Sequence, residues 1–119
     1  MTQEEKDLLL KDLSTRLPYG VKGIITYNGD KDIFTVKGIF NILFLSDTEC
    51  CHLEDFKPYL RPMSSMTEEE EIFYNIKYPY IKNYEQMDWL NAHHFDYRGL
   101  IEKGFALEAP EDMYNINEK

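Results

Sequence analysis

Apolar residues near the start of the chain recur at the spacing that lines one face of an α-helix. They are Leu9, Leu10, Leu13 and Leu17. Thr2 and Glu5 form the capping-box pattern T-x-x-E, in which two side chains satisfy backbone groups at a helix start. Pro18 disfavours helical geometry at the residue before it. The pattern therefore predicts a helix in residues 1–17 that ends near Arg16 and packs on a sheet.

Residues 20–60 change to the patterns of β-strands and turns. Three short runs are rich in β-branched and aromatic residues, namely GVKGIITY (20–27), DIFTVKGIF (32–40) and NILFLS (41–46). Asn28 and Gly29 supply a tight turn between the first two runs. We expect an antiparallel three-stranded β-meander that forms a small curled sheet. Gly23 and Gly38 interrupt the strand patterns, which often marks a bulge or the close approach of another backbone.

Residues 47–66 follow no regular pattern. Pro58 and Pro62 exclude a long helix in this segment, so we expect it to be a loop. The loop side chains expected to be buried are Leu53, Phe56, Tyr59 and Leu60.

Helical spacing returns in residues 65–104. Ser65 and Glu68 repeat the capping-box pattern and predict a helix over residues 67–77. The first turn of this helix carries four glutamates, which complement the positive end of the helix dipole. The apolar residues expected to face the core are Ile72, Phe73 and Ile76.

Two further helical segments are expected before the C-terminus. Asn83 caps the first, which runs to the histidine pair at 93–94. Asp96 caps a last short helix, 97–103, and Gly104 ends it as a residue with left-handed backbone geometry. The side chains expected to point inward from the first helix are Met87 and Leu90.

The order of these elements sets the fold class. One helix, then strands, then two to three C-terminal helices is the segregated arrangement of an α+β protein. With 119 residues the chain is one domain by length, and it shows no internal repeat or linker. The expected parts are a helix (1–17), a β-meander with a loop (20–60), a helical part (65–104) and a frayed polar tail (110–119).

The composition adds an acidic charge and an excess of aromatic residues, which suggests either a small tyrosine-rich core or a binding surface. The chain has nine Tyr, seven Phe and one Trp, and Tyr and Trp suit interfaces because they bury a large area at low rotamer cost. The formal net charge is −9, of which residues 1–60 carry −3 and residues 61–119 carry −6. An acidic field repels nucleic-acid phosphates, so a basic protein partner, or a role of the charge in solubility alone, fits better.

The cysteines and the apolar stretches predict the compartment. Cys50 and Cys51 are adjacent and cannot easily reach disulfide geometry, and free thiols suit a reducing cytoplasm. The N-terminus lacks the basic and apolar regions of a signal peptide. The longest apolar stretch, 39–45, is too short to span a bilayer. We therefore expect a cytoplasmic protein that does not enter the membrane.

Reactive residue types crowd together in WLNAHHFDYRGLI, residues 89–101. Consecutive helical residues point about 100° apart, so His93 and His94 do not suit one metal ion. The i, i+4 histidine spacing of helical zinc sites is missing as well. The set that remains is His94 and Asp96 with the distant His52. The structural alternative, in which one histidine caps a helix C-terminus and the other packs, explains the pair without metal, and we expect no metal site.

An enzymatic site has suitable residue types in this chain but no recognisable arrangement. Cys50 or Cys51, a histidine, and Asp88 or Asp96 are present, but the local signatures of catalytic cysteines are absent. G-x-S-x-G, P-loop and G-x-G-x-x-G motifs are absent too. An enzyme or metalloprotein that uses His94 and Asp96 is the least favoured function. We expect a non-enzymatic protein with no catalytic residue and no cofactor.

A recognition surface is the functional alternative for the same stretch. Arginine and aromatic side chains together are typical of interface hot spots. In the structural alternative, Asp96 caps a helix while Arg98 lies over an aromatic ring or against a helix end. The candidate interaction surface consists of Trp89, His93, His94, Tyr97 and Arg98.

A nucleic-acid-associated β-sheet is the alternative function. Exposed aromatic side chains on a small sheet can stack bases, and lysines of the predicted meander would supply local positive charge. The residues concerned are Tyr27, Phe34 and Phe40 with Lys22, Lys31 and Lys37. The net charge of −9 disfavours this function.

Four stretches of the chain together resemble a known family. They are LPYGVKG (17–23), FKPYLRPMSSMTEEE (56–70), DWLNAHHFDYRGLI (88–101) and ALEAPEDMYN (106–115). The family consists of short uncharacterised proteins from gut Bacteroidales genomes, their prophages and mobile elements, with no assigned activity. The resemblance covers most of the chain and is weakest in 24–55. It implies a bacterial or phage origin and a cytoplasmic accessory role, and it transfers no catalytic residue. We expect an accessory or regulatory module that binds another protein.

Overall fold

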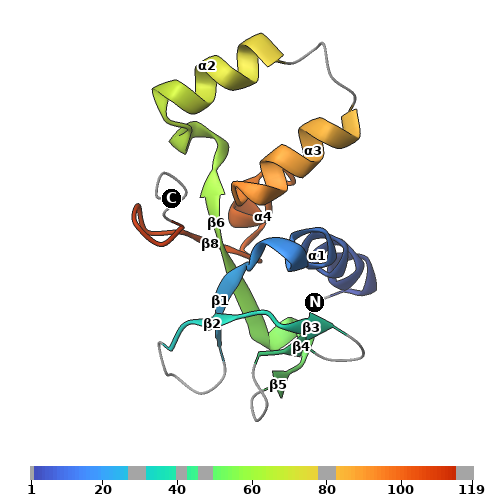
Figure 1. The fold of residues 1–119 in the computed structure, drawn as a ribbon. Coiled ribbons are helices and arrows are strands. Elements are labelled where there is room, and N and C mark those ends of the chain that lie inside the picture. The colour runs from blue at the N-terminus through green and yellow to red at the C-terminus, as the bar shows by residue number, and fades with distance from the viewer. Residues whose placement is uncertain (1, 27–31, 40–42, 46–49, 78–82, 115–119) are drawn as a thin grey trace.

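The computed structural model describes residues 2–26, 32–39, 43–45, 50–77 and 83–114. Figure 1 shows an N-terminal helix beside a mixed sheet, with further helices towards the C-terminus, so the expected α+β class is confirmed. The helices are α1 (Gln3–Arg16), α2 (Glu68–Lys77), α3 (Asn83–Ala92) and α4 (Leu100–Lys103), with 3-10 turns at Leu17–Tyr19, Leu53–Asp55 and Met63–Ser65. The strands are β1 (Lys22–Ile25), β2 (Phe34–Thr35), β3 (Gly38–Ile39), β4 (Leu43–Phe44), β5 (Cys50–Cys51), β6 (Phe56–Pro62), β7 (Phe95–Asp96) and β8 (Leu107–Glu108).

Helix α1 begins and ends where the sequence predicts. Thr2 and Glu5 form the complete capping box, and the helix ends at Arg16. Leu9 and Leu13 are fully buried, as expected. The remaining two leucines of the predicted stripe, Leu10 and Leu17, are exposed and half-buried respectively. Polar Asp12 and Arg16 instead complete the buried face of the helix.

The central strand of the main sheet, β6, lies in the segment that was predicted to be a loop. That prediction was wrong, because side chains along β6 alternate between buried and half-buried positions, with Phe56, Pro58 and Leu60 on the buried side. β6 pairs with β1 in antiparallel orientation and with β7 and β8 in parallel orientation. Because β6 contains Pro58 and Pro62, the sequence pattern does not indicate a strand in this segment. Other residues of β6 make backbone hydrogen bonds to the neighbouring segments. For example, the amide of Arg61 donates to the carbonyl of His94 at 2.8 Å.

Gly23 allows β1 to approach β6 closely. It is paired with Pro58, and a Cβ atom at this position would overlap both the carbonyl oxygen of Lys57 and the ring of Phe56. The prediction that Gly23 marks a close backbone approach is therefore confirmed.

The predicted three-stranded meander forms in a different part of the chain. The run 32–40 divides into β2, which pairs with β1, and β3, which belongs to a second sheet. That second sheet has the antiparallel order β3-β4-β5 and consists of residues 38–39, 43–44 and 50–51, whereas the meander was expected within residues 20–46. Val36, between β2 and β3, is buried and its amide donates to the carbonyl of Val21 at 2.9 Å. The buried Val36 therefore lies at the point where the run passes from the first sheet to the second.

Helices α2 and α3 extend away from the sheets and form what is called here the arm (residues 63–77 and 83–92). Figure 1 shows α2 at the far end of β6, with α3 leading back towards α1. The radius of gyration is 14.6 Å, against about 13.5 Å for a compact chain of this length. The principal extents of 43 × 30 × 26 Å show the same elongation.

The exposure of the arm corrects several burial predictions. Ile72, Phe73 and Met87 were expected to face the core, but they are 53%, 43% and 39% exposed. Leu90 is buried as predicted, because it lies where α3 meets the body of the protein. Ile76 lies outside the side chains that the structure describes.

Helix α2 begins one residue later than predicted, and its capping residue lies two positions after the predicted Ser65. Thr67 and Glu70 form the capping box, with the Glu70 amide donating to the Thr67 hydroxyl at 3.1 Å and the Thr67 amide to the Glu70 carboxylate at 2.8 Å. Ser65 instead donates to the carbonyl of Pro62. Two capping-box patterns overlap in the sequence, S-x-x-E at Ser65–Glu68 and T-x-x-E at Thr67–Glu70. The hydrogen bonds of Glu70 show that the second pattern caps the helix.

The C-terminal part of the chain is only partly helical. Gly104 ends α4 with a φ of +83°, as predicted. The short strands β7 and β8 were not predicted, and they add this part of the chain to the main sheet. Within the described residues, no helix has the length and apolar character needed to cross a membrane.

Candidate functional site

The stretch 89–101 forms a joint between α3, β7 and α4. His94 follows α3 with a φ of +64°, and its amide donates to the carbonyl of Asn91 at 3.0 Å. The Nδ1 atom of His93 lies 2.9 Å from the carbonyl oxygen of Trp89. Because a carbonyl only accepts hydrogen bonds, this contact requires the proton on Nδ1. The expectation that one histidine caps the helix C-terminus while the other packs is confirmed.

Aromatic rings connect the two helices of the arm to the sheet. Trp89 stacks with Phe73 of α2 at a centroid distance of 5.6 Å, with His93 at 4.3 Å and with Phe95 of β7 at 5.8 Å. Tyr74 lies against Trp89 at 5.7 Å and accepts a hydrogen bond from the side chain of Gln86. This group of rings is called here the Trp89 stack.

An ion pair holds the base of α2 on the sheet. Arg61 of β6 donates to both carboxylate oxygens of Glu70, at 2.9 and 2.7 Å, and its guanidinium lies 4.2 Å from the centroid of the Phe95 ring. Burial acts to raise the pKa of Glu70, but the hydrogen bonds from Arg61 and from the Thr67 amide outweigh it and lower the pKa. Glu70 is therefore charged when folded, and only the side of α2 that carries it is covered.

A buried ionic network joins α1 to the turn after β7. Asp12 and Arg16 are both fully buried, with Arg16 Nε 2.7 Å from Asp12 Oδ2. Arg98 donates to Asp12 Oδ1 at 2.7 Å, and Arg16 donates to the carbonyl of Phe95 at 2.6 Å. Asp12 and Arg16 were not singled out from the sequence. The signal was their helical spacing from the buried leucines, since Asp12 lies three positions after Leu9 and Arg16 three positions after Leu13.

Tyr97 extends this network to α3. Its hydroxyl donates to the side-chain oxygen of Asn91 at 2.8 Å and accepts from Arg98 at 3.0 Å. The guanidinium groups of Arg98 and Arg16 lie 4.7 and 5.3 Å from the centroid of its ring. The expectation that Arg98 lies over an aromatic ring is confirmed. Within the described residues, Arg16 Nη1 is buried without a hydrogen-bond partner, whereas the other polar groups named in the network have structural partners. The network therefore mainly positions helices.

A second buried contact anchors the end of the described chain. The rings of His94 and Tyr114 stack at a centroid distance of 3.6 Å. The Tyr114 hydroxyl accepts from the amide of Lys22 at 2.7 Å and donates to the carbonyl of Tyr59 at 2.8 Å. The tail 110–119 was predicted to be frayed, and this is wrong for residues 110–114, because Tyr114 is buried. Residues 115–119 lie outside the described residues.

Burial changes the proton affinity of both stacked rings. Desolvation lowers the pKa of His94 to about 3, and the nearby positive charge of Arg16 acts in the same direction. Desolvation likewise raises the pKa of Tyr114. Both rings are therefore neutral at physiological pH.

Asp96 bonds the start of the last helix, as the sequence suggested, but that helix begins at Leu100 with Gly99 as its N-cap instead of at residue 97. Its Oδ1 accepts from the amide of Leu100 at 2.9 Å and its Oδ2 from the amide of Ile101 at 3.0 Å, so it caps α4 with both oxygens. His94 packs on Tyr114, and His52 is exposed elsewhere. Across the described segments, no group of three His, Cys, Asp or Glu side chains is arranged to hold a metal ion.

The five residues of the predicted interaction surface belong to three different groups. Trp89 and His93 lie in the Trp89 stack, His94 lies on Tyr114, and Tyr97 and Arg98 lie in the ionic network. His94 is buried and the other four are half-buried. These residues therefore hold the joint together, and the larger exposed apolar surface lies elsewhere.

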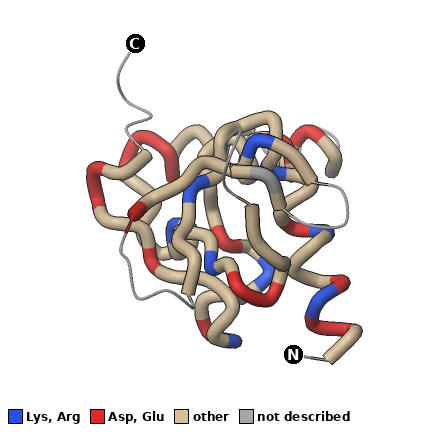
Figure 2. Tube along the Cα trace, turned by 90° about the horizontal axis from the view of Figure 1, so that it is seen from below, with Lys and Arg blue, Asp and Glu red and all other residues tan. Residues whose placement is uncertain are grey.

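The residues proposed for base stacking do not form an exposed platform in the part of the chain that is described. Phe34 packs against the core, and Lys22 donates to the Thr35 hydroxyl at 3.2 Å. Lys37 is exposed, whereas Tyr27, Lys31 and Phe40 lie outside the described residues. Figure 2 shows basic positions scattered among acidic ones along the described trace, without a continuous basic stripe.

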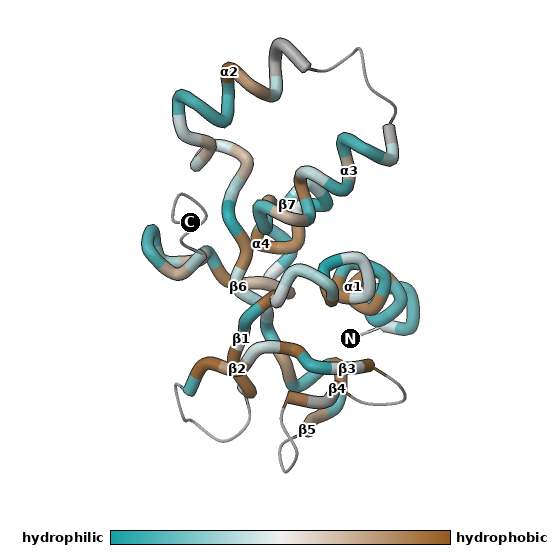
Figure 3. Tube along the Cα trace, viewed as in Figure 1, coloured by the Kyte–Doolittle hydropathy of each residue, from teal (hydrophilic) through white to brown (hydrophobic). Residues whose placement is uncertain are grey.

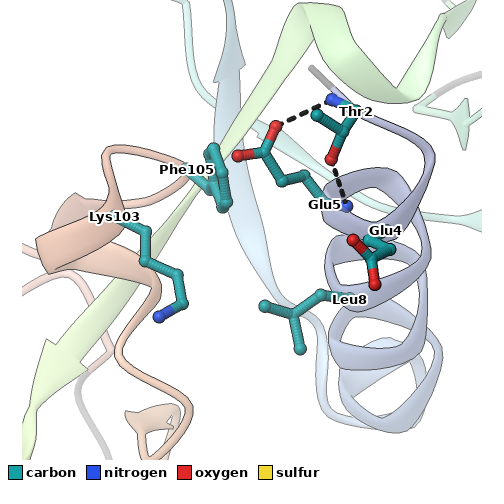
Figure 4. A pocket seen from close by; sticks show the side chains of 6 residues that line it. All are labelled: Thr2, Glu4, Glu5, Leu8, Lys103 and Phe105. Atoms are coloured by element: carbon teal, nitrogen blue, oxygen red, sulfur yellow. Dashed lines mark hydrogen bonds between the residues drawn. The ribbon is translucent and has the colours of Figure 1, made fainter.

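An open groove lies between the start of α1 and the segment after α4. Its volume is about 560 Å³, and its lining residues are Thr2, Glu4, Glu5, Leu8, Lys103 and Phe105. Figure 4 shows that Thr2 and Glu5 are already bonded to each other in the capping box, with Lys103 reaching in from the opposite side. The groove offers carboxylates and one lysine but no arrangement of nucleophile and base.

The exposed apolar side chains concentrate on the arm. Among the described residues, the large hydrophobic side chains with high exposure are Leu10, Tyr19, Ile33, Met63, Ile72, Phe73, Tyr84 and Met87. The last five of these fall between residues 63 and 87. Figure 3 shows an apolar stretch in the middle of α2, flanked by polar turns. The arm is therefore the surface with the strongest tendency to bind another molecule.

Comparison of the chain with protein-family models, with curated proteins and with solved structures gives no match. Function is therefore inferred from the contacts, burial and charge of the described residues.

Proposed function

We propose that this protein is a non-enzymatic accessory or regulatory module, of a bacterium, prophage or mobile element, that binds another protein through its arm. The concentration of exposed apolar side chains on α2 and α3 carries this proposal. Exposed apolar side chains that gather on one part of a soluble protein mark binding sites more often than singly scattered ones do. The aromatic-rich composition supports the same function, because Tyr, Phe and Met are enriched at interfaces.

The attachment of the arm to the body also favours binding. The Arg61–Glu70 ion pair and the Trp89 stack hold α2 by one side only, and leave its other side exposed. A surface that is already ordered before binding loses less conformational entropy when a partner arrives. The arm therefore has both exposed apolar area and a fixed scaffold.

Site-specific photo-crosslinking in cells tests the proposal. A photoreactive phenylalanine analogue would replace Ile72 or Tyr84 on the arm, and in the control it would replace Tyr19 on the body. Tyr84 is 61% exposed and Tyr19 is 38% exposed, so all three positions can reach a partner. We expect the arm positions, expressed in Bacteroidales cells, to yield discrete protein adducts that the Tyr19 position does not. Equal adduct patterns from arm and body, or no adducts from the arm, would contradict the proposal.

A further inference from the structure

We infer that the outer face of α2 binds a basic amphipathic helix of the partner protein. This inference rests on the proposed function and narrows it to one surface and one partner chemistry. The α2 face is defined by Glu68, Glu69, Ile72 and Phe73, all of which are exposed.

Helical spacing makes these four residues one surface. Ile72 lies three and four positions after Glu69 and Glu68, and Phe73 lies four positions after Glu69, so the side chains are neighbours on the helix. Glu70 marks the covered side of α2 through its ion pair with Arg61. Since successive residues turn by about 100°, Ile72 points about 160° away from Glu70. Ile72 is therefore directed away from the sheet, whereas Phe73, about 60° from Glu70 by the same rotation, lies at the inner edge of the α2 face, where it stacks on Trp89.

The charge of this face selects the partner. The charged side chains of α2 that the structure describes are the four glutamates at positions 68–71. Of these four, Glu70 is the one that forms an ion pair with Arg61. Glu68, Glu69 and Glu71 stay exposed beside the apolar pair. Complementary potentials steer association and suppress binding of like-charged partners. A partner segment with lysine or arginine beside its apolar side chains fits this face, whereas a second copy of the chain or a nucleic acid would bring negative charge to it.

The backbone of the face favours a helix over an extended strand as the bound segment. An added strand needs an exposed sheet edge with unpaired amides and carbonyls, and the interior of a helix has none to offer. The contact must then be made by side chains alone. An amphipathic helix presents apolar residues at i, i+3, i+4 and i+7 with basic residues alongside, which matches two neighbouring apolar side chains flanked by carboxylates.

The protein carries its own reporter for this contact. Trp89 is the only tryptophan of the chain, and it stacks on Phe73 from the inner side of α2 at 5.6 Å. A ligand that covers Phe73 changes the surroundings of that ring pair, so the emission of Trp89 reports binding at this face. The same emission remains unaffected by ligands that bind distant parts of the protein.

The test titrates the full chain with a designed helical peptide of leucine and lysine, without tryptophan, of about 18 residues or five turns. A scrambled peptide of the same composition, with no apolar face, is the first control. Vesicles of zwitterionic lipid are the second. We expect saturable changes in Trp89 emission with the amphipathic peptide and at least tenfold weaker binding of the scrambled one. Equal binding of both peptides, or a response to vesicles in place of the peptide, would overturn the inference.

Matched variants locate the contact. Ile72→Ser removes apolar area, and Glu68→Gln with Glu69→Gln removes two charges from the first turn of α2. Glu4→Gln with Glu102→Gln removes two exposed charges from α1 and α4, away from α2 (Figure 1). We expect Ile72→Ser and the α2 charge variant each to weaken peptide binding about tenfold, and the latter to reduce its salt dependence. The α1 and α4 variant should bind within about twofold of the wild type.

The outcomes separate this inference from the proposed function. Equal weakening by both charge variants would show general attraction to an acidic protein and would overturn the inference. Loss of a wild-type dimer in Ile72→Ser, measured by analytical ultracentrifugation, would assign the face to a second copy and would also overturn it. Adducts at the arm in cells without peptide binding would leave protein binding standing and reject the basic helix. Absence of adducts at the arm would reject the proposed function whatever the peptide does.

Discussion

The carboxylate of Asp12 on α1 is fully buried and accepts a hydrogen bond of 2.7 Å from Arg98, which lies 86 positions later in the chain. The same carboxylate is paired with Arg16, so two arginines depend on one buried acid. This contact fixes where α1 lies relative to the joint that carries α3, and α3 in turn carries the exposed arm. A polar interior network thus sets the position of the surface proposed to bind a partner.

Replacement of Asp12 by Ala is expected to reduce the free energy of unfolding by about 3–5 kcal/mol, because it leaves the buried guanidinium of Arg16 without its counter-charge. Urea unfolding followed by circular dichroism measures the change. The double variant Asp12→Leu with Arg16→Met should recover most of the loss, since apolar replacement of a buried pair is often neutral. A loss below about 1 kcal/mol in the single variant would contradict the role assigned to the network.

The protein is expected to lose stability as pH falls from about 6.5 towards 3, because of His94. Its pKa is about 3 when folded, against 6.5 for a free histidine, so the unfolded chain binds a proton that the folded chain does not. The free energy of unfolding should therefore fall by up to about 1.4 kcal/mol per pH unit within that window. Urea midpoints between pH 7 and 5 test this above the range where carboxylates titrate.

His94→Asn is the control for this pH dependence. Asparagine tolerates the left-handed backbone found at His94, where φ is +64°. The variant should show a flatter dependence of stability on pH than the wild type. An unchanged slope would assign the pH dependence to other groups.

Tyr114→Phe removes the hydroxyl that joins the amide of Lys22 to the carbonyl of Tyr59. Both backbone groups would then lack this partner, at a cost of about 1–3 kcal/mol. Hydrogen exchange at the Lys22 amide should accelerate in parallel with the fall in stability. Tyr84→Phe, at an exposed position, is the matched control and should change neither quantity. Equal effects of the two substitutions would contradict the anchoring role of Tyr114.

Gly23→Ala is expected to destabilise the protein by about 2–3 kcal/mol, because the added methyl group overlaps the Lys57 carbonyl and the Phe56 ring. Thermal unfolding measures the effect. Gly99→Asn provides the comparison, since no atom lies within 4 Å of a Cβ there and asparagine tolerates its φ of +74°. Gly99→Asn should cost less than about 1 kcal/mol. A smaller loss for Gly23→Ala than for Gly99→Asn would rule out the close approach of β1 and β6.

The sequence by itself determined the features that depend on neighbouring residues. The capping box of Thr2 and Glu5, the cap by Asp96 and the left-handed end at Gly104 each use atoms within five positions of one another. The α+β class follows from the same local patterns, because helix and strand periodicities occupy separate parts of the chain. The close approach at Gly23 was also visible, since a glycine within a strand pattern has few other uses.

The tertiary structure alone decided which segments form the centre of the sheet and which surfaces stay exposed. β6 contains two prolines, and β7 and β8 are two residues long, so each is a strand only because distant backbones supply its partners. Ile72 and Phe73 were predicted to face the core, but Ile72 is 53% exposed, and Phe73 is 43% exposed although it stacks on Trp89. Burial and pairing depend on contacts between residues far apart in sequence, and those contacts leave the α2 face exposed where local patterns predicted the core.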